Sequence, residues 1–252
     1  MFSKIKIVHI EETKSTQDTV IDYLKNDFYT SLLLIAKIQT SGRGRKNDDW
    51  ASPEGGFWAT LGTSTSLTLK ESQLALFHYS TAILLARAIK EEYDLPVQIK
   101  WPNDILYENK KLAGILIDYV TSSQKNYILI GMGVNLNNSS DDMPRALRKI
   151  AISIKDILHR SISIDDLARK ICFYATHYYM PIIDSDSKKI QNLIQEYNQQ
   201  SRSYRKEVFL DDSKKYFCNG INNEGLMEFS DGNTILRLTM NDSTRIKKIC
   251  SF

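Results

Sequence analysis

The pattern of apolar residues changes near Gln200, and this change most limits what the chain can fold into. Before this point, short apolar runs typical of strands alternate with longer stretches whose apolar residues recur at helical spacing. After it, short candidate strands follow one another, separated by turns rich in Asp, Asn and Gly. The sequence therefore predicts an α+β unit over residues 1–185 and a small β-barrel over residues 200–252.

The same patterns predict the individual elements. In the first unit we expect strands at Lys4–Ile10, Ser31–Ile38, Phe57–Gly62, Val97–Trp101, Asp104–Tyr107, Leu112–Val120 and Tyr127–Val134. We expect helices from Ser15 onward and at Ser72–Glu92, Ile164–Tyr179 and Ser187–Gln199. The expected barrel strands are Val208–Leu210, Tyr216–Asn222, Leu226–Phe229, Thr234–Met240 and Ile246–Cys250. Ser15 is the expected N-cap of the first helix, with Asp18 as its capping-box partner.

Composition excludes several classes of protein. With 42% hydrophobic and 25% charged residues, the chain as a whole is not disordered, collagen-like or a coiled coil. A formal net charge of +3 provides no whole-surface field for nucleic acid, so we expect no DNA partner and only local anion sites. Cys172, Cys218 and Cys250 stand far apart without a CxxC pair, which favours a reducing cytosol over a disulfide framework.

No targeting signal stands out in the sequence. The N-terminus has no long apolar region followed by a small-residue cleavage site, so we expect no signal peptide. The longest apolar runs, Leu32–Ala36 and Ala82–Ala86, are far shorter than the ~20 residues that a membrane span needs. We expect a cytoplasmic protein without a membrane partner.

Glycine is concentrated in one part of the chain. Eight of the eleven glycines fall between Gly42 and Gly133, which marks backbone that turns tightly or lies close to a ligand. Gly42-Arg43-Gly44-Arg45 fits an anion cradle, because exposed N–H groups and two guanidiniums supply donors, but it fits a solvated basic turn equally well. Gly131 and Gly133 leave one strand face bare, as a flat ligand or a bulge would require. No P-loop, dinucleotide fingerprint or histidine metal spacing is present.

Two further motifs place charged residues at strand ends. Lys100-Trp101-Pro102-Asn103-Asp104 combines a cation, an amide and a carboxylate, although alone it is more often a turn with an Asx cap. Lys111-Leu112-Ala113-Gly114-Ile115-Leu116 has small residues that let another group approach the backbone, although Lys110 and Lys111 alone are typical exposed turn lysines. Ser15-Thr16 alone is most often a helix N-cap.

Together, the order and spacing of these motifs resemble the biotin–protein ligases (biotin–[acetyl-CoA-carboxylase] ligases). The resemblance covers residues 5–140 and is carried by Thr13-Lys14-Ser15-Thr16-Gln17, Gln39-Thr40-Ser41-Gly42-Arg43-Gly44-Arg45, Trp50 with Ser52-Pro53, Lys100–Asp104, Lys111–Leu116 and Gly131-Met132-Gly133-Val134-Asn135. It implies a mixed sheet with helices, followed by an SH3-like β-barrel. Because the first expected strand starts at Lys4, directly upstream of the Ser-Thr motif, we expect the monofunctional form without a DNA-binding domain.

The resemblance implies a two-step reaction. The carboxylate of biotin attacks the α-phosphorus of Mg-ATP, giving biotinyl-5′-AMP and pyrophosphate. A lysine of a biotin carboxyl carrier protein or domain then attacks the mixed anhydride and releases AMP. ATP and Mg²⁺ are therefore implied as co-substrate and ion, with biotin as substrate and no tightly bound prosthetic group; a homodimer is left open. A carboxylate and a triphosphate repel each other, so cations are needed, and Arg43, Arg45, Lys100 and Lys111 would supply them.

The resemblance also implies a role for each motif residue. Lys111 and Arg45 are the implied catalytic residues, and Asp104 is implied to orient a cation or a metal-bound water. The implied biotin-binding residues are Ser15, Thr16, Gln17, Gln39, Gly42, Arg43, Gly44, Arg45, Lys111, Gly114, Gly131 and Gly133. The implied ATP-binding residues are Arg45, Trp50, Lys100, Asn103, Lys111 and Asn135. Hydroxyls and amides suit the ureido head of biotin because they both donate and accept hydrogen bonds.

One stretch departs from the family pattern. After Arg45 the family continues with a basic-glycine-basic stretch, whereas this chain has Lys46-Asn47-Asp48-Asp49 before Trp50. We expect Asn47 to take the left-handed conformation in place of glycine, at some cost. Asp48 replaces a cation expected near the triphosphate, which predicts weaker ATP binding.

Two other functions are weighed against this one. A lipoate or octanoate ligase or transferase of the same architecture would need a long apolar tunnel and a different lysine context, so the Lys100–Asp104 and Lys111–Leu116 motifs favour biotin. A nucleic-acid-binding module is disfavoured by the small net charge and the lack of an aromatic-basic stripe.

Overall fold

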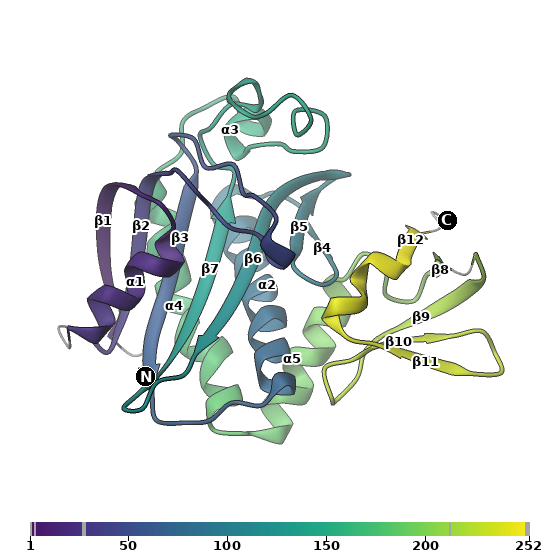
Figure 1. Cartoon of the computed structure of the whole chain (residues 1–252). Coiled ribbons are helices and arrows are strands. Elements are labelled where there is room, and N and C mark those ends of the chain that lie inside the picture. The colour runs from purple at the N-terminus through teal and green to yellow at the C-terminus, as the bar shows by residue number, and fades with distance from the viewer. Residues whose placement is uncertain (1, 3, 27–28, 212, 250–252) are drawn as a thin grey trace.

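A seven-stranded mixed sheet forms the larger part of the molecule in the computed structural model, which describes residues 2, 4–26, 29–211 and 213–249 (Figure 1). Its strands are β1 (Lys6–Thr13), β2 (Ser31–Gln39), β3 (Phe57–Thr65), β4 (Gln98–Lys100), β5 (Asp104–Tyr107), β6 (Lys110–Val120) and β7 (Asn126–Val134). They lie in the order β1-β2-β3-β7-β6-β5-β4. β1 and β2 run parallel, and the other described neighbours run antiparallel.

Helices cover both faces of this sheet. They are α1 (Thr16–Lys25), α2 (Glu71–Tyr93), α3 (Ile154–Leu158), α4 (Ile164–Ile183) and α5 (Ser187–Gln200), with 3-10 turns η1 (Arg45–Asn47) and η2 (Ser140–Asp142). The helices α2, α4 and α5 lie behind the sheet in Figure 1, and α1 lies in front of β2, β3 and β7. In the part of the chain that the structure describes, no helix has the length and apolar character to cross a membrane.

A glycine lets α1 approach the sheet closely. Val20 and Leu24 are its fully buried apolar residues, and they pack against β2 and β7. A Cβ at Gly62 would lie 2.7 Å from Val20 Cγ2 and 2.9 Å from Leu24 Cδ1, so a larger residue there would push α1 outward. This packing fixes the N-terminus of α1 over the middle of the sheet.

The predicted elements are confirmed, with small differences at their ends, but the predicted capping box at α1 is wrong. Ser15 is the N-cap residue, yet its side chain makes no capping hydrogen bond. The Thr16 N–H group donates instead to Gln39 Oε1 at 2.8 Å, and the Asp18 carboxylate accepts from Arg43 Nη2 at 2.8 Å. Tertiary partners have replaced the local cap, since Gln39 and Arg43 lie directly beside the first turn.

A second, five-stranded antiparallel sheet follows α5, where the sequence predicts a small β-barrel. Its strands are β8 (Glu207–Leu210), β9 (Lys215–Ile221), β10 (Met227–Ser230), β11 (Ile235–Leu238) and β12 (Ile246–Ile249), in the order β11-β10-β9-β8-β12. The strand expected over Thr234–Met240 ends at Leu238, and a 3-10 helix, η3 (Met240–Arg245), leads to β12. Cys250, expected at the end of β12, lies outside the described residues.

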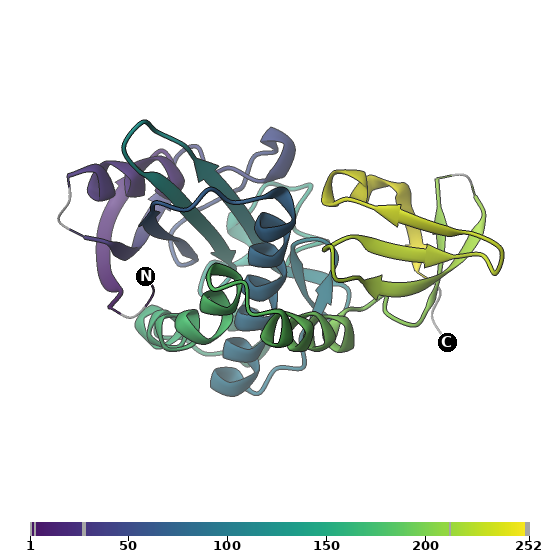
Figure 2. The same cartoon turned by 90° about the horizontal axis from the view of Figure 1, so that it is seen from below.

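The C-terminal sheet stands beside the larger unit and is joined to it by buried contacts (Figure 2). Tyr79 on α2 donates its hydroxyl to the Gly225 carbonyl at 2.8 Å, and desolvation raises the pKa of Tyr79 to about 12. The Asn198 side chain on α5 bonds the backbone N–H and C=O groups of Ile221 at 2.8 and 3.0 Å. One apolar core runs through both units, so the division between residues 185 and 200 stays a prediction.

Candidate active site

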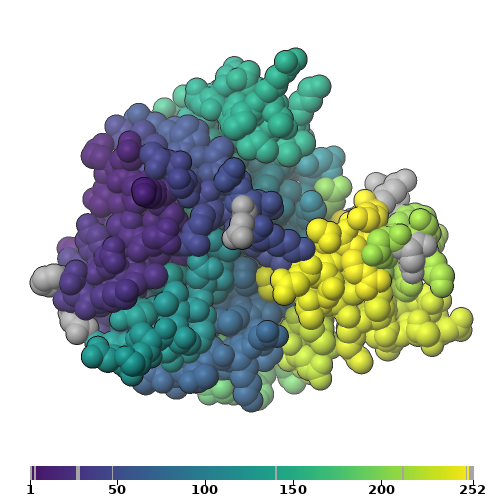
Figure 3. All heavy atoms as spheres, in the orientation of Figure 1, coloured from purple at the N-terminus to yellow at the C-terminus, as the bar shows by residue number. Residues whose placement is uncertain are grey.

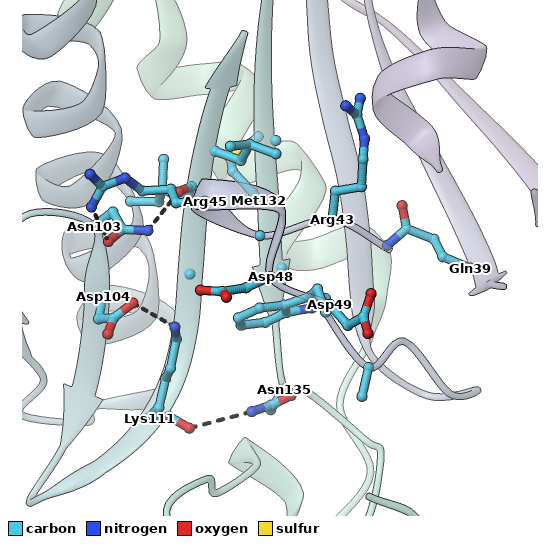
Figure 4. Close-up of a pocket in the computed structure, with 18 of the residues that line it drawn as sticks. Gln39, Arg43, Arg45, Asp48, Asp49, Asn103, Asp104, Lys111, Met132 and Asn135 are labelled. Atoms are coloured by element: carbon cyan, nitrogen blue, oxygen red, sulfur yellow. Dashed lines mark hydrogen bonds and ion pairs between the residues drawn. The ribbon is translucent and has the colours of Figure 1, made fainter. Parts of the chain in front are cut away.

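A cavity of about 470 Å³ lies over the centre of the seven-stranded sheet. Its floor is formed by β6 and β7, and one end by the N-terminus of α1. The remaining walls come from residues 40–56 between β2 and β3 (hereafter the arginine loop), from residues 143–151 (the rim segment) and from η3. Figure 4 shows side chains from several of these elements directed toward a common space. The volume suits a small ligand.

The end of the cavity near α1 is lined by uncharged polar side chains. Gln39 Oε1 accepts from the backbone N–H of Thr16 at 2.8 Å and from its hydroxyl at 3.0 Å. Gln39 Nε2 donates to Ser52 Oγ at 2.8 Å. The Thr16 hydroxyl also lies 2.8 Å from Thr60 Oγ1 on β3. Because both ends of the Gln39 amide are bonded, this wall has a fixed arrangement of donors and acceptors.

Gln17 leaves one buried acceptor free in this wall. Its Nε2 donates to the Leu116 carbonyl at 3.1 Å, which sets the orientation of the amide. Its Oε1 is buried and has no hydrogen-bond partner among the described residues. A Cβ at Gly131 would lie 2.9 Å from Gln17 Nε2, so the glycine gives the side chain its place. An unpartnered buried acceptor is costly, and a donor on a bound molecule would satisfy it.

The opposite end of the cavity carries a lysine-carboxylate pair. Lys111 Nζ lies 2.6 Å from Asp104 Oδ1, and it lies 4.9 Å from the centre of the Trp50 ring. The Lys111 backbone is held on its other side, because it donates to the Ile150 carbonyl at 2.7 Å and accepts from Ile152 N–H at 3.1 Å. The ammonium group is therefore fixed between a carboxylate and an aromatic face (Figure 4).

Two paired glycines make the floor flat, and an indole ring lies on it. Gly114 and Gly133 are direct partners in the β6–β7 register. A Cβ would lie 2.8 Å from the Trp50 ring at Gly114 and 2.6 Å from it at Gly133. The predicted bare strand face is therefore confirmed, and its occupant in this structure is Trp50. The indole N–H is buried without a hydrogen-bond partner among the described residues.

The arginine loop is a hairpin closed by its own backbone. Trp50 N–H donates to the Gly42 carbonyl at 2.8 Å, and Gly44 N–H donates to the Asp48 carbonyl at 2.7 Å. The left-handed residue within it is Lys46, with φ of 56°, and not Asn47 as predicted. The 3-10 turn spans Arg45–Asn47, so its central residue is Lys46 and not Asn47.

The two arginines of the loop have different surroundings. Arg43 is exposed and donates to Asp18 at 2.8 Å, with Asp118 at 3.5 Å. Arg45 is half-buried, and it donates to Asn103 Oδ1 at 3.4 Å and to the Met240 carbonyl at 2.6 Å. Desolvation lowers the pKa of the Arg45 guanidinium, although Asp104 opposes this. Burial likewise raises the pKa of Asp118, although Arg43 opposes this.

Most of the residues selected from the sequence line the cavity. These are Ser15, Thr16, Gln17, Gln39, Arg43, Gly44, Arg45, Trp50, Asn103, Asp104, Lys111, Gly114, Gly131, Gly133 and Asn135. Gly42 and Lys100 are not among the lining residues. Lys100 is exposed at the end of β4. Gly42 is a buried residue of the arginine loop, and a Cβ there would be 2.5 Å from the Trp50 carbonyl oxygen.

Sequence reasoning missed several lining residues. They are Lys46, Asp49, Ala51, Ala59, Thr60, Ile115, Leu116, Met132, Met143, Leu147, Ile150, Ala151, Ser243 and Thr244. The rim segment carries no motif and little regular structure, so nothing in the sequence marked its apolar residues as part of a site. Its place is set by the backbone pairing of Ile150 and Ile152 with Lys111. Ser243 and Thr244 come from the C-terminal sheet, about 130 residues beyond Lys111 in the sequence, and only the fold brings them here.

The cavity therefore combines three kinds of surface. One end offers fixed uncharged donors and acceptors, the middle is a flat glycine floor, and the other end holds Arg45 and Lys111. Such a cavity can hold a molecule with a polar head and an acidic tail, and it can bring that acid to a second anion.

Comparisons with known proteins agree with this geometry. Residues 9–135 match the model of the biotin/lipoate A/B protein ligase family. The bifunctional ligase/repressor of Bacillus spizizenii is 33% identical over 187 residues, which are 70% of this chain and 57% of that protein. The human biotin–protein ligase is 36% identical over 144 residues, 54% of this chain and 20% of that protein. The chain thus spans less than two thirds of these relatives.

Solved structures show the same fold over nearly the whole chain. The biotin protein ligase of Aquifex aeolicus, solved in complex with biotin and ATP, has a TM-score of 0.75 at 20% identity. The match covers 96% of this chain and 97% of that one. The biotin protein ligase of Leishmania major, solved with biotinyl-5-AMP, has a TM-score of 0.62 at 24% identity, covering 93% and 98% of the two chains.

Proposed function

Because the chain belongs to the biotin/lipoate A/B protein ligase family, we propose that it is an ATP-dependent biotin–protein ligase. It activates biotin as biotinyl-5′-AMP and transfers it to a lysine of a biotin carboxyl carrier domain. The human relative named above is a biotin–protein ligase, and of the two similar structures one was solved with biotin and ATP and the other with biotinyl-5-AMP.

One observation carries the proposal: a single cavity joins the polar end at Thr16, Gln17 and Gln39 to the cations Arg45 and Lys111. A urea has two N–H donors and a carbonyl acceptor, so it needs both kinds of partner. The free Gln17 Oε1 supplies an acceptor, and the Ser15 hydroxyl can donate or accept. The Thr16 hydroxyl gives its proton to Gln39, so toward a ligand it can only accept. The ureido head of biotin fits this end, and its valeryl carboxylate then extends across the cavity toward Lys111, beside the Trp50 ring that lies on the glycine floor.

In the first step, a carboxylate oxygen of biotin attacks the α-phosphorus of ATP, and the bond from that phosphorus to the bridging β-phosphate oxygen breaks. Negative charge stays on the phosphoryl oxygens throughout, so fixed donors aimed at them lower the barrier. Lys111 holds the reacting oxygens, and Asp104 keeps its ammonium in place at 2.6 Å. Arg45 has donors left for phosphate, because Asn103 and Met240 occupy only part of its guanidinium.

A magnesium ion that enters with ATP fits a site of this composition. The described residues contain no group of three or more His, Cys, Asp or Glu side chains that could hold a metal ion. Mg²⁺ is commonly bound by one or two carboxylates together with phosphates and waters. Asp104, one of the carboxylates that line the cavity, would hold the ion directly or through water, and the ion would neutralise charge on the phosphates.

In the second step, the amine of a carrier lysine attacks the carbonyl carbon of the mixed anhydride. An amide bond forms, the bond to the phosphate oxygen breaks, and AMP leaves. The anhydride must be kept from water until the carrier arrives. The arginine loop lines the cavity and its Trp50 ring lies on the glycine floor, so the loop is in a position to cover the anhydride.

A lipoate or octanoate ligase or transferase is the second candidate of the same family. Its substrate has no ureido group and needs an apolar tunnel. The end of the cavity at Gln17 and Gln39 carries bonded amides and hydroxyls instead, and this observation favours biotin.

The direct test is biotin-dependent pyrophosphate release. The protein is incubated with ATP, inorganic pyrophosphatase and either biotin or lipoate, and phosphate is followed together with the mass of the product. We expect release with biotin and a product with the mass of biotinyl-AMP. Release with lipoate but not with biotin would favour the second candidate, and no release with either would reject both ligase assignments.

A further inference from the structure

The 3-10 helix η3 of the C-terminal sheet holds the two basic side chains at the tip of the arginine loop. Arg45 Nη2 donates to the Met240 carbonyl at 2.6 Å, and Lys46 Nζ donates to the Asn241 carbonyl at 2.9 Å. Ser243 and Thr244 of the same turn line the cavity. In Figure 3 the yellow C-terminal atoms meet the blue atoms of this loop.

Asp242 fixes the conformation of this turn. Its Oδ2 accepts from the Thr239 backbone N–H at 2.9 Å and from the Thr239 hydroxyl at 2.7 Å. The Asp242 N–H donates to the Thr239 carbonyl at 3.0 Å. These bonds form the capping box that starts η3. The carbonyls of Met240 and Asn241, which hold Arg45 and Lys46, lie between its two residues in the chain. The carbonyl directions therefore depend on Asp242.

The far end of η3 is held as well. Arg245 Nε lies 3.2 Å from both carboxylate oxygens of Asp211, at the end of β8. The turn is thus closed at its start by its own capping box and anchored at its end beside β8, and it connects the C-terminal sheet to the arginine loop.

We propose that Asp242 is a positioning residue for the ATP end of the site, acting through η3 on Arg45 and Lys46. This inference rests on the function proposed above. A guanidinium has five N–H donors and an ammonium three, so each side chain can stay bonded to η3 and still present donors to the phosphates. Held in this way, the two cations lose less conformational freedom when ATP binds.

The chain offers a matched control in the same sheet. Asp231 caps the turn between β10 and β11 in the same manner, accepting from the backbone N–H of Thr234 at 2.8 Å and from its hydroxyl at 3.1 Å. Asp231 is exposed and does not line the cavity. Asp231→Ala therefore removes an equivalent cap without touching the loop.

The first experiment measures steady-state pyrophosphate release. In Asp242→Ala we expect the KM for ATP to rise about tenfold and the KM for biotin to change less than about twofold. Asp231→Ala should leave both constants unchanged. In a background of Arg45→Gly with Lys46→Ala, adding Asp242→Ala should have almost no further effect on the KM for ATP. A full additional effect in that background would overturn the proposal, as would an unchanged KM in Asp242→Ala.

The second experiment needs no enzymatic activity. Trypsin cleaves after Arg45 and Lys46, and in the native protein both side chains are held by η3. Asp242→Ala should speed cleavage at this pair several-fold, whereas Asp231→Ala should not; equal rates in both variants would overturn the proposal. If Asp242→Ala fails to fold, Asp242→Asn is used, since the amide oxygen still accepts but more weakly. Failure of the proposed function would instead appear in the unmutated protein, as absence of biotin-dependent pyrophosphate release.

Discussion

The two walls of the cavity are built in different ways. The wall at α1, β6 and β7 (the sheet wall) rests on a continuous sheet in which β7 pairs with both β3 and β6, and its functional side chains sit on these strands or at the start of α1. The arginine loop, the rim segment and η3 (together the loop wall) belong to no sheet and are held by a few separate contacts, such as those from Arg45 to Met240 and from Lys46 to Asn241. Rigid elements fix position more precisely than loops do, so the first wall is suited to recognition and the second to closure.

We expect the largest effect from a substitution of Lys111, the cation of the sheet wall. Lys111→Ala should abolish biotin-dependent pyrophosphate release, because losing a preorganised donor to the phosphoryl oxygens costs about 3–4 kcal/mol, or ~10²–10³ in rate. Lys111 is only partly buried, so the melting temperature should change little. Lys110→Ala is the matched control, because Lys110 is exposed and does not line the cavity. A folded Lys111→Ala protein with near-normal release would remove the assigned role.

Gly133→Ala, in the glycine floor, tests whether Trp50 must lie flat on the sheet. An alanine at Gly133 would place its Cβ 2.6 Å from the indole, so the ring has to move. Overpacking of this kind costs about 1–3 kcal/mol, which we expect to appear as roughly tenfold weaker binding of biotin and ATP with a smaller loss of stability. Tryptophan fluorescence and the two KM values measure it. Gly232→Ala is the control for stability alone, since nothing lies near its Cβ and only its φ of 94° is strained.

The loop wall is tested by Arg45→Gly, which removes both of its contacts with Asn103 and Met240. The sheet wall stays intact, so we expect biotinyl-AMP still to form but to leave the cavity several-fold faster. Released adenylate then labels lysines on bystander proteins, which streptavidin blotting detects. Labelling confined to the carrier, with an unchanged adenylate lifetime, would show that the loop does not retain the intermediate.

The same contrast explains what the sequence could predict. The residues of the sheet wall could be predicted from motifs. Each of these motifs (Ser15-Thr16-Gln17, the Lys111 strand and Gly131–Gly133) combines a local pattern with side chains of one chemical type. The small C-terminal β-domain also followed from spacing and turn residues. By contrast, Ile150 pairs with Lys111 across a stretch without a pattern, and Met240 meets Arg45 across 195 residues. Such contacts depend on tertiary packing, which local propensity does not encode.

The wrong expectation at the start of α1 has the same cause. Ser15 and Asp18 were expected to cap α1 together. Instead Gln39 on β2 accepts from the Thr16 N–H group, and Arg43 of the arginine loop donates to the Asp18 carboxylate. Lys100, which the resemblance implies to bind ATP, does not line the cavity, and its role stays a prediction. Residues of a strand point alternately to opposite sides, and in β4 Ile99 is buried while Lys100 is exposed.

Asp48 gives the smallest expected effect and the finest test of the loop wall. Both Asp48 and Asp49 line the cavity, but in Figure 4 the Asp48 carboxylate extends toward Lys111 and the Asp49 carboxylate extends to the opposite side of the loop. At ~6 Å and an effective dielectric near 40, one charge pair is worth about 1.4 kcal/mol, and less at physiological salt. Asp48 is exposed, so screening keeps the gain from reversing its sign at or below roughly 2–3 kcal/mol.

Asp48→Arg should therefore lower the KM for ATP several-fold and leave the KM for biotin nearly unchanged, since the polar end of the cavity is not altered. The gain should shrink when salt is raised, because the added attraction is partly screened. Asp49→Arg at the same two salt concentrations is the control, as it makes the same change of net charge with the side chain on the other side of the loop. An equal effect from both variants would mean that the loop responds to overall charge, and no effect from Asp48→Arg would place its side chain away from the phosphates. A larger effect from Asp48→Arg than from Asp49→Arg would show that the loop wall, although held by few contacts, still directs individual side chains at the nucleotide.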